Sequence, residues 1–173
     1  MQGAVARAQD RLEYNENRHR VYHFLLDTPG VTASDIALGL GMNLGTVRYH
    51  LLVLTLNRRI ITYKDESKFH RYFNNSGAYT DDEMALLSLI RRKPLQKIVN
   101  ALMEQRKLSG PDLAKRLNIS EKSIYKHITK LSGEGILEKL PEKDQGLYAI
   151  KVERREQIRE IMERSEHLAV IIK

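Results

Sequence analysis

An internal repeat constrains the fold of this 173-residue chain more than any other feature. Residues 31–60 reappear without a gap 77 positions later. The matches fall at helix caps, at apolar positions and at one histidine: Thr32 with Ser109, Asp35 with Asp112, Ala37 with Ala114, Leu40 with Leu117, Asn43 with Ser120, Val47 with Ile124, His50 with His127, Leu54 with Leu131 and Ile60 with Leu137. Self-similarity of this kind predicts two copies of one structural unit.

The first copy predicts three helices. Residues 4–27 are predicted to form a helix, broken or bent near 15–17, which ends at Pro29-Gly30. A second helix begins at Thr32, whose side chain caps it, and closes at Gly41. Asn43 caps the third, in which Val47, Leu51 and Leu54 lie on one apolar face. Two short helices joined by a tight turn after a leading helix make a helix-turn-helix.

A β-hairpin follows these helices directly. Residues 60–64 and 69–73 are rich in β-branched and aromatic side chains, and a polar run separates them. The second copy has the same parts, with a leading helix at 95–105 and strands at 136–140 and 147–150. A helix-turn-helix followed by a hairpin is a winged helix-turn-helix.

The predicted fold is therefore mainly α with small β-hairpin wings. Two tandem winged helix-turn-helix domains occupy residues 1–78 and 79–152, and a C-terminal helix occupies 153–173. A capping box, Thr80 to Glu83, opens a helix through Ile90 that begins the second domain.

The C-terminal helix carries apolar residues at heptad spacing. They are Ile158, Ile161, Leu168 and Ile172, with Ser165 between them. Barely two heptads fit, so two alternatives stay open: the helix pairs two chains into a homodimer, or it packs on its own domain.

Charge favours a polyanionic partner. The net charge is +7 with a pI near 9.6, and the excess is spread over both copies. There is no cysteine, no apolar run long enough to span a membrane, and no signal-peptide core. No catalytic motif emerges, so we expect no enzyme and no cofactor. His19 and His23 have zinc spacing, as Glu163 and His167 loosely do, but a third ligand is missing and we expect no metal site.

The run from Asn17-Arg18 through Thr28-Pro29-Gly30 and Gly45-Thr46-Val47-Arg48-Tyr49-His50-Leu51 resembles prokaryotic winged helix-turn-helix regulators of the ArsR-like type. The nearest form is the tandem winged-helix regulator common in archaea. The resemblance covers residues 17–74 well and 95–152 more loosely. It implies that the second helix of each motif, about 43–56 and 120–132, enters the major groove of double-stranded DNA while the wing follows the backbone.

By position, the resemblance assigns the DNA-binding residues. The base readers are Asn43, Thr46, Arg48 and Tyr49 in the first copy, and Ser120, Lys122, Ser123, Tyr125 and Lys126 in the second. Better placed for phosphates are Lys64, Lys68, Arg71, Lys130, Lys139 and Lys143. Arg48 and Tyr49 differ between the copies, so specificity is expected there.

Two features have open interpretations. His50 and His127 either contact phosphates or hold their helix to a neighbour through a hydrogen bond. Arg58-Arg59 replaces the glycine-containing turn that the second copy keeps as Gly133-Glu134-Gly135, and these arginines either contact phosphates or are solvated.

The sequence thus predicts a cytoplasmic, sequence-specific transcriptional regulator. The alternative is a winged-helix scaffold that docks proteins, which Leu44 and Leu52 favour slightly. In a mixed case, one copy reads DNA and the other docks. Some archaeal relatives carry a membrane segment, and the sequence has none, so the chain is either a soluble regulator or the soluble part of one.

Overall fold

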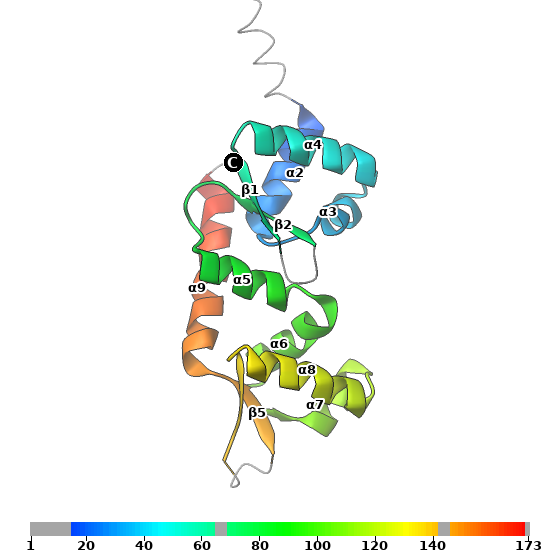
Figure 1. Cartoon of the computed structure of the whole chain (residues 1–173), viewed down its shortest axis with the longest axis vertical. Helices are drawn as coiled ribbons and strands as arrows, with labels where there is room; N and C mark the ends of the chain where they lie inside the picture. The colour runs from blue at the N-terminus through cyan, green and yellow to red at the C-terminus, as the bar shows by residue number, and fades with distance from the viewer. Residues whose placement is uncertain (1–14, 65–68, 142–145, 172–173) are drawn as a thin grey trace, which may run out of the picture. The chain divides into compact units, whose positions relative to one another are not determined.

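The computed structural model describes residues 15–64, 69–141 and 146–171. The chain divides into two compact units. The first contains residues 1–88 together with 164–173, and the second contains residues 89–163. Each unit is a set of helices with a small antiparallel sheet (Figure 1), so the prediction of a mainly helical fold with hairpins is confirmed.

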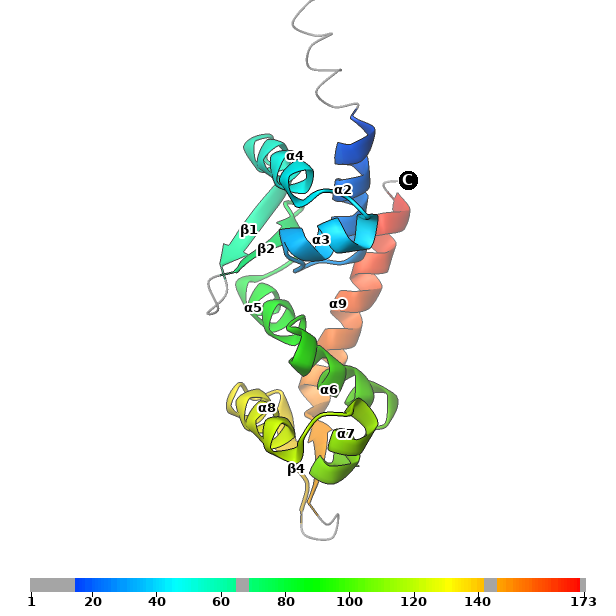
Figure 2. The same cartoon turned by 90° about the vertical axis from the view of Figure 1, so that its right-hand side faces the viewer.

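The first unit is built on three helices and a hairpin. They are α2 (Glu16–Asp27), α3 (Ala33–Leu40), α4 (Leu44–Leu56), β1 (Ile60–Lys64) and β2 (His70–Asn74). α4 packs on both α2 and α3, and the hairpin contacts α2 and α4 (Figures 1 and 2). The core joins apolar side chains of all three helices and the hairpin: Val21, Leu25, Val31, Ile36, Val47, Leu51, Leu54 and Ile60.

The caps explain where these helices begin. Asn15 accepts a hydrogen bond from the Arg18 amide at 3.2 Å and starts α2. Thr32 and Asp35 bond each other's backbone amides in a full capping box at α3. Asn43 accepts from the Gly45 amide at 2.8 Å and starts α4. Each cap satisfies amides that the first helical turn leaves unpaired. The predicted caps at Thr32 and Asn43 are confirmed.

The second unit repeats this plan. It contains α6 (Lys93–Glu104), β3 (Leu108–Ser109), α7 (Gly110–Leu117), α8 (Glu121–Gly133), β4 (Leu137–Lys139) and β5 (Leu147–Ile150). The strands form one antiparallel sheet in the order β3-β5-β4. α7 and α8 lie side by side, and the β4–β5 hairpin extends away from them (Figures 1 and 2).

The two copies correspond more closely than the sequence alone indicates. Three helices of the first unit, shifted by 77, give the bounds of α6, α7 and α8 at both ends. The correspondence therefore begins at α2, well before the predicted start at residue 31. In the last strand the shift falls to 76: the bridge of Val31 with Tyr72 becomes the β3–β5 pair of Leu108 with Tyr148.

Two turns in each copy take the left-handed backbone conformation at matching positions. After the middle helix, Gly41 has φ 62° and Asn118 has φ 52°. Before the wing, Gly135 has φ 67° while its counterpart Arg58 has φ 55°. Glycine adopts this conformation without strain, whereas a side chain with a Cβ is disfavoured there. Arg58 therefore holds a conformation that its residue type resists.

We expect Arg58→Gly to stabilise the first unit. Relief of left-handed strain outweighs the extra freedom that glycine gives the unfolded chain, so the gain should be about 0.5–1 kcal/mol. Urea denaturation followed by circular dichroism measures it. The matched change Gly135→Ala should lower stability. If both changes lowered stability, the assignment of strain to Arg58 would be contradicted.

Packing between the first two helices differs between the copies in a compensating way. The Phe24 ring lies against Gly39, where a Cβ would come within 2.4 Å of ring carbons. At the matching positions the second copy has Ala101 and Arg116. The first copy therefore has its large residue on the first helix of the pair, and the second copy has its large residue on the second helix.

Two further helices, α5 (Asp81–Ile90) and α9 (Val152–Ile171), each run across a boundary between units. The predicted capping box is confirmed: the Thr80 amide donates to Glu83 at 2.8 Å and Thr80 Oγ1 accepts from the Glu83 amide. Arg164 of α9 donates to Glu83 at 2.9 Å and to the Ala78 carbonyl. In the second unit, Arg155 of α9 donates to the carbonyls of Leu102 and Met103 at the end of α6.

Part of the predicted heptad seam is already buried within one chain. Ile158 is 4% exposed and Ile161 is fully buried. The side chains of residues 165–171 lie outside the described ones, and pairing of two chains through α9 remains a prediction. None of the described helices has the length and apolar character needed to cross a membrane.

Candidate nucleic-acid interface

The third helix of each copy has one buried and one exposed face. In α4 the buried residues are Val47, His50, Leu51 and Leu54, and in α8 they are Ile124, Ile128 and Leu131. The opposite faces carry most of the predicted base readers. Thr46, Arg48 and Tyr49 are exposed on α4, as are Lys122, Tyr125 and Lys126 on α8.

The exposed face of α8 is strongly basic. Lys122, Lys126 and Lys130 are spaced by four residues, so they lie along one side of the helix. Lys130 is half-buried and pairs with Glu134 at 3.7 Å. Lys139 of β4 is exposed and adds a cation on the hairpin. This row of ammonium groups gives α8 a face that attracts a nucleic acid.

The exposed face of α4 is largely apolar. Tyr49, Leu52 and Leu56 are 55%, 58% and 73% exposed, and they follow one another at spacings of three and four residues. Arg48 is the one charged residue of the helix. Burial raises the pKa of Tyr72 on β2, and the positive charge of Arg48 opposes this shift. The two third helices therefore present different chemistry.

The caps at the two helix starts use some of the predicted base readers. Asn43 is exposed but holds the Gly45 amide. Ser120 Oγ accepts from the Ser123 amide at 3.4 Å and bonds Ser123 Oγ at 3.0 Å. Tyr125 lies over the start of α7, where a Cβ on Gly110 would meet its hydroxyl oxygen at 2.7 Å. Gly110 therefore makes room for the ring.

The structure contradicts the predicted contact between Arg71 and a DNA phosphate. Its side chain is buried, donates to the Gly30 carbonyl at 3.2 Å and lies 3.9 Å from an Asp35 oxygen. It holds the end of α2 and the start of α3 to β2, so the prediction of a phosphate contact is wrong. Lys64 is exposed on β1. Lys68 and Lys143 lie outside the described residues.

His50 is also unavailable to DNA. The ring is 3% exposed, and its Nδ1 is buried without a hydrogen-bond partner among the described residues. The prediction that His50 contacts DNA is wrong, and no hydrogen bond from Nδ1 supports the alternative. The nearby Arg18 guanidinium is 6% exposed, and its Nε and Nη1 are buried without a partner in the same part of the chain. His127, the counterpart of His50, is half-buried.

We expect His50 to make the first unit less stable below neutral pH. Burial, with the charge of Arg18, lowers the pKa of His50 in the folded chain below 6.5. The unfolded chain takes up a proton at its ordinary pKa, so the free energy of unfolding falls as the pH drops below 6.5. His50→Leu should reduce this dependence in urea denaturation at pH 7.5 and 5.5. An identical pH dependence in both proteins would contradict the prediction. His127→Leu is the matched variant in the second unit.

His19 and His23 come together as their spacing predicts, with the two Nε2 atoms 2.9 Å apart. No group of three or more potential metal ligands gathers anywhere in residues 15–64, 69–141 and 146–171. The pair alone does not make a coordination site.

The comparison with protein families gives a match in the second copy. A family model described as an HTH domain matches residues 94–151. This range runs from the start of α6 to the end of β5 and includes the basic face of α8. The match and the hairpin strands together support a winged helix-turn-helix, DNA-binding protein. No curated protein matches the chain.

Proposed function

We propose that the chain is a sequence-specific transcriptional regulator whose α8 reads the major groove of double-stranded DNA. The observation that carries the proposal is the row of exposed Lys122 and Lys126 and half-buried Lys130 on α8, in the region that matches a helix-turn-helix family. Lys122, Tyr125 and Lys126 face away from the core and would meet base edges. Lys130 and Lys139 would contact phosphates and fix the register of the helix.

In this proposal α4 is a second recognition helix. Arg48 and Tyr49 are its candidate readers, and a bidentate contact of Arg48 with guanine would contribute about 1–3 kcal/mol of discrimination. Because the exposed faces of α4 and α8 differ, we expect a target site without a palindrome inside the footprint of one chain. A regulator of this kind would act in the cytoplasm, and pairing through α9 would double the number of recognition helices.

The test is a fluorescence-anisotropy titration of the full chain against genomic DNA fragments at 50 and 200 mM salt. Affinity that falls steeply with salt, together with preference for some fragments, is the expected result because each phosphate contact releases bound counterions. Binding that is insensitive to salt, or absent for every fragment, would overturn the proposal.

The second candidate function is protein docking through the first copy. It is favoured by the apolar stripe of Tyr49, Leu52 and Leu56 on α4, where a DNA-reading helix ordinarily carries polar groups. Arg48→Ala and Lys126→Ala separate the cases. If Lys126→Ala weakens DNA binding and Arg48→Ala changes neither affinity nor sequence preference, α8 reads DNA and α4 serves another purpose.

A further inference from the structure

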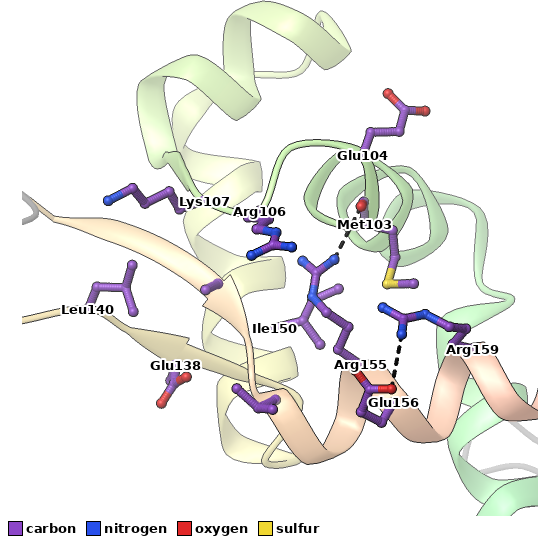
Figure 3. Close-up of a pocket in the computed structure, with 12 residues that line it drawn as sticks. Met103, Glu104, Arg106, Lys107, Glu138, Leu140, Ile150, Arg155, Glu156 and Arg159 are labelled. Carbon is purple, nitrogen blue, oxygen red and sulfur yellow. Dashed lines mark hydrogen bonds and ion pairs between the residues drawn. The ribbon is translucent and has the colours of Figure 1, made fainter.

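A cleft in the second unit lies away from the exposed face of α8. Its walls are the end of α6, the hairpin strands β4 and β5, and the first two turns of α9 (Figure 3). Its volume is about 550 Å³, which is within the range of sites for small organic ligands. Every residue that lines it belongs to the second unit.

Three arginines line this cleft. Arg155 donates to the carbonyls of Leu102 at 2.5 Å and Met103 at 3.2 Å, which leaves the rest of its five N–H groups for other partners. Arg159 pairs with Glu156 at 3.0 Å. Arg106 is exposed and makes no hydrogen bond or ion pair with any described residue. Figure 3 shows the guanidinium groups of Arg106 and Arg155 close together over Ile150.

The proximity of these like charges is electrostatically unfavourable. Burial and then the positive charges of Arg106 and Arg159 lower the pKa of Arg155. An anion placed between two guanidinium groups attracts both of them and so offsets their mutual repulsion. A carboxylate can also accept two parallel hydrogen bonds from one guanidinium group. The Arg106 fork is unused and suits this geometry.

The charge of the lining favours an anion. The lining contains four cations, the three arginines with Lys107, and three carboxylates, Glu104, Glu138 and Glu156. Glu104 pairs with Arg116 and Glu156 with Arg159. The lining alone carries a net charge of +1, and Arg116 offsets Glu104 from outside it, so positive charge is in excess and favours a bound anion.

The rest of the lining favours a ligand with an apolar body. Met103, Leu140, Ile150 and Val152 contribute carbon surface beside the arginines, and Val152 is 70% exposed. A bound hydrocarbon chain would cover that surface and gain the hydrophobic contribution of each buried methylene.

We propose that the cleft bounded by α6, β4, β5 and α9 binds a small aliphatic monocarboxylate, with its carboxylate on Arg106 and Arg155 and its chain on Leu140 and Val152. This site is separate from the DNA-reading face of α8, and the proposal holds whether or not the chain binds DNA. Because Arg155 joins α9 to the end of α6, a ligand there would strengthen the attachment of α9 within this unit.

The test is isothermal titration calorimetry of the full chain with sodium hexanoate at constant ionic strength, and with sodium acetate in parallel. We expect saturable binding of hexanoate that is roughly tenfold or more tighter than that of acetate, since each buried methylene adds to affinity. Absence of saturable hexanoate binding, or equal affinity for both acids, would overturn the proposal.

Two variants identify the carboxylate contact. Arg106→Ala should weaken hexanoate binding about tenfold or more because it removes a charge-assisted bidentate fork. Arg106 is exposed and without partners in the described chain, so the variant should fold, which its circular dichroism melting curve checks. Arg154→Ala is the matched control, because it removes the same charge beside Arg155 from a residue outside the lining. Equal losses in both variants would indicate general electrostatic attraction and would also overturn the proposal.

Discussion

The double substitution Lys122→Ala and Lys126→Ala should weaken binding to DNA by roughly 50- to 100-fold near 0.1 M salt. Both ammonium groups lie on the exposed face of α8. Because Lys122 and Lys126 are assigned to base edges, the loss should fall mainly on the preferred fragment and should narrow the preference between fragments. The slope of log affinity against log salt concentration, about 0.9 for each phosphate contact, should keep the contribution of Lys130 and Lys139. Anisotropy titrations over a range of salt concentrations measure both quantities.

The matched control removes two lysines from another helix of the same unit. Lys93 and Lys97 are exposed on α6, and Lys93→Ala with Lys97→Ala changes the net charge equally. We expect this variant to keep most of the affinity and the slope. If both double variants lose the same affinity, the protein attracts DNA through its overall charge, and the assignment of α8 as the recognition helix is wrong.

The second large effect concerns the packing of Phe24 on Gly39. A methyl group on Gly39 would overlap the Phe24 ring, with 2.4 Å to two ring carbons. We expect Gly39→Ala to destabilise the first unit by about 1–2 kcal/mol, as overpacking does. In a Phe24→Ala background the same change should stabilise it by about 0.5–1 kcal/mol, because alanine is the better helix former.

Urea denaturation of the four proteins of this double-mutant cycle gives the coupling directly. The sign of the effect of Gly39→Ala should reverse between the two backgrounds. Additive effects would show that Phe24 moves aside without cost, and that the complementary pair in the second copy, Ala101 with Arg116, does not reflect a packing constraint.

The core and the caps of each copy could be predicted from sequence because they rest on local rules. A capping side chain needs one amide a few residues away, and a helical face needs a period of 3.6 residues. Thr32, Asn43 and the apolar faces of α4 and α8 follow from such rules. The strands of both hairpins also lie within a residue or two of their predicted positions.

Position along the motif predicts DNA contacts for Arg71 and His50, whereas the periodicity of β2 and α4 predicts that both side chains are buried. In a strand, residues two apart face the same side, so Arg71 shares a face with Phe73, which is fully buried. His50 lies three residues after Val47 and four before Leu54, on the apolar face of α4. The residue spacing in β2 and in α4 therefore predicts that both side chains are buried.

Other features depend on contacts that sequence does not display. The short strand β3 exists only because Leu108 and Ser109 pair with β5, some 40 residues away. The correspondence of α2 with α6 is hidden because Arg18 matches Leu95, although both side chains are buried. The cleft that Arg106 and Arg155 line joins residues from four elements and has no linear motif.

The position of Tyr125 over Gly110 limits how DNA specificity can be exchanged between the two copies. The matching residues in the first copy are Arg48 and Ala33. If residues 121–133 replaced 44–56, the tyrosine ring would overlap the Cβ of Ala33, because the ring fills the space that a Cβ on Gly110 would occupy in the second copy. A chimera that carries α8 in the first copy therefore needs Ala33→Gly as well. DNA specificity can be exchanged between the copies only by transferring both helices of the motif, and not the recognition helix alone.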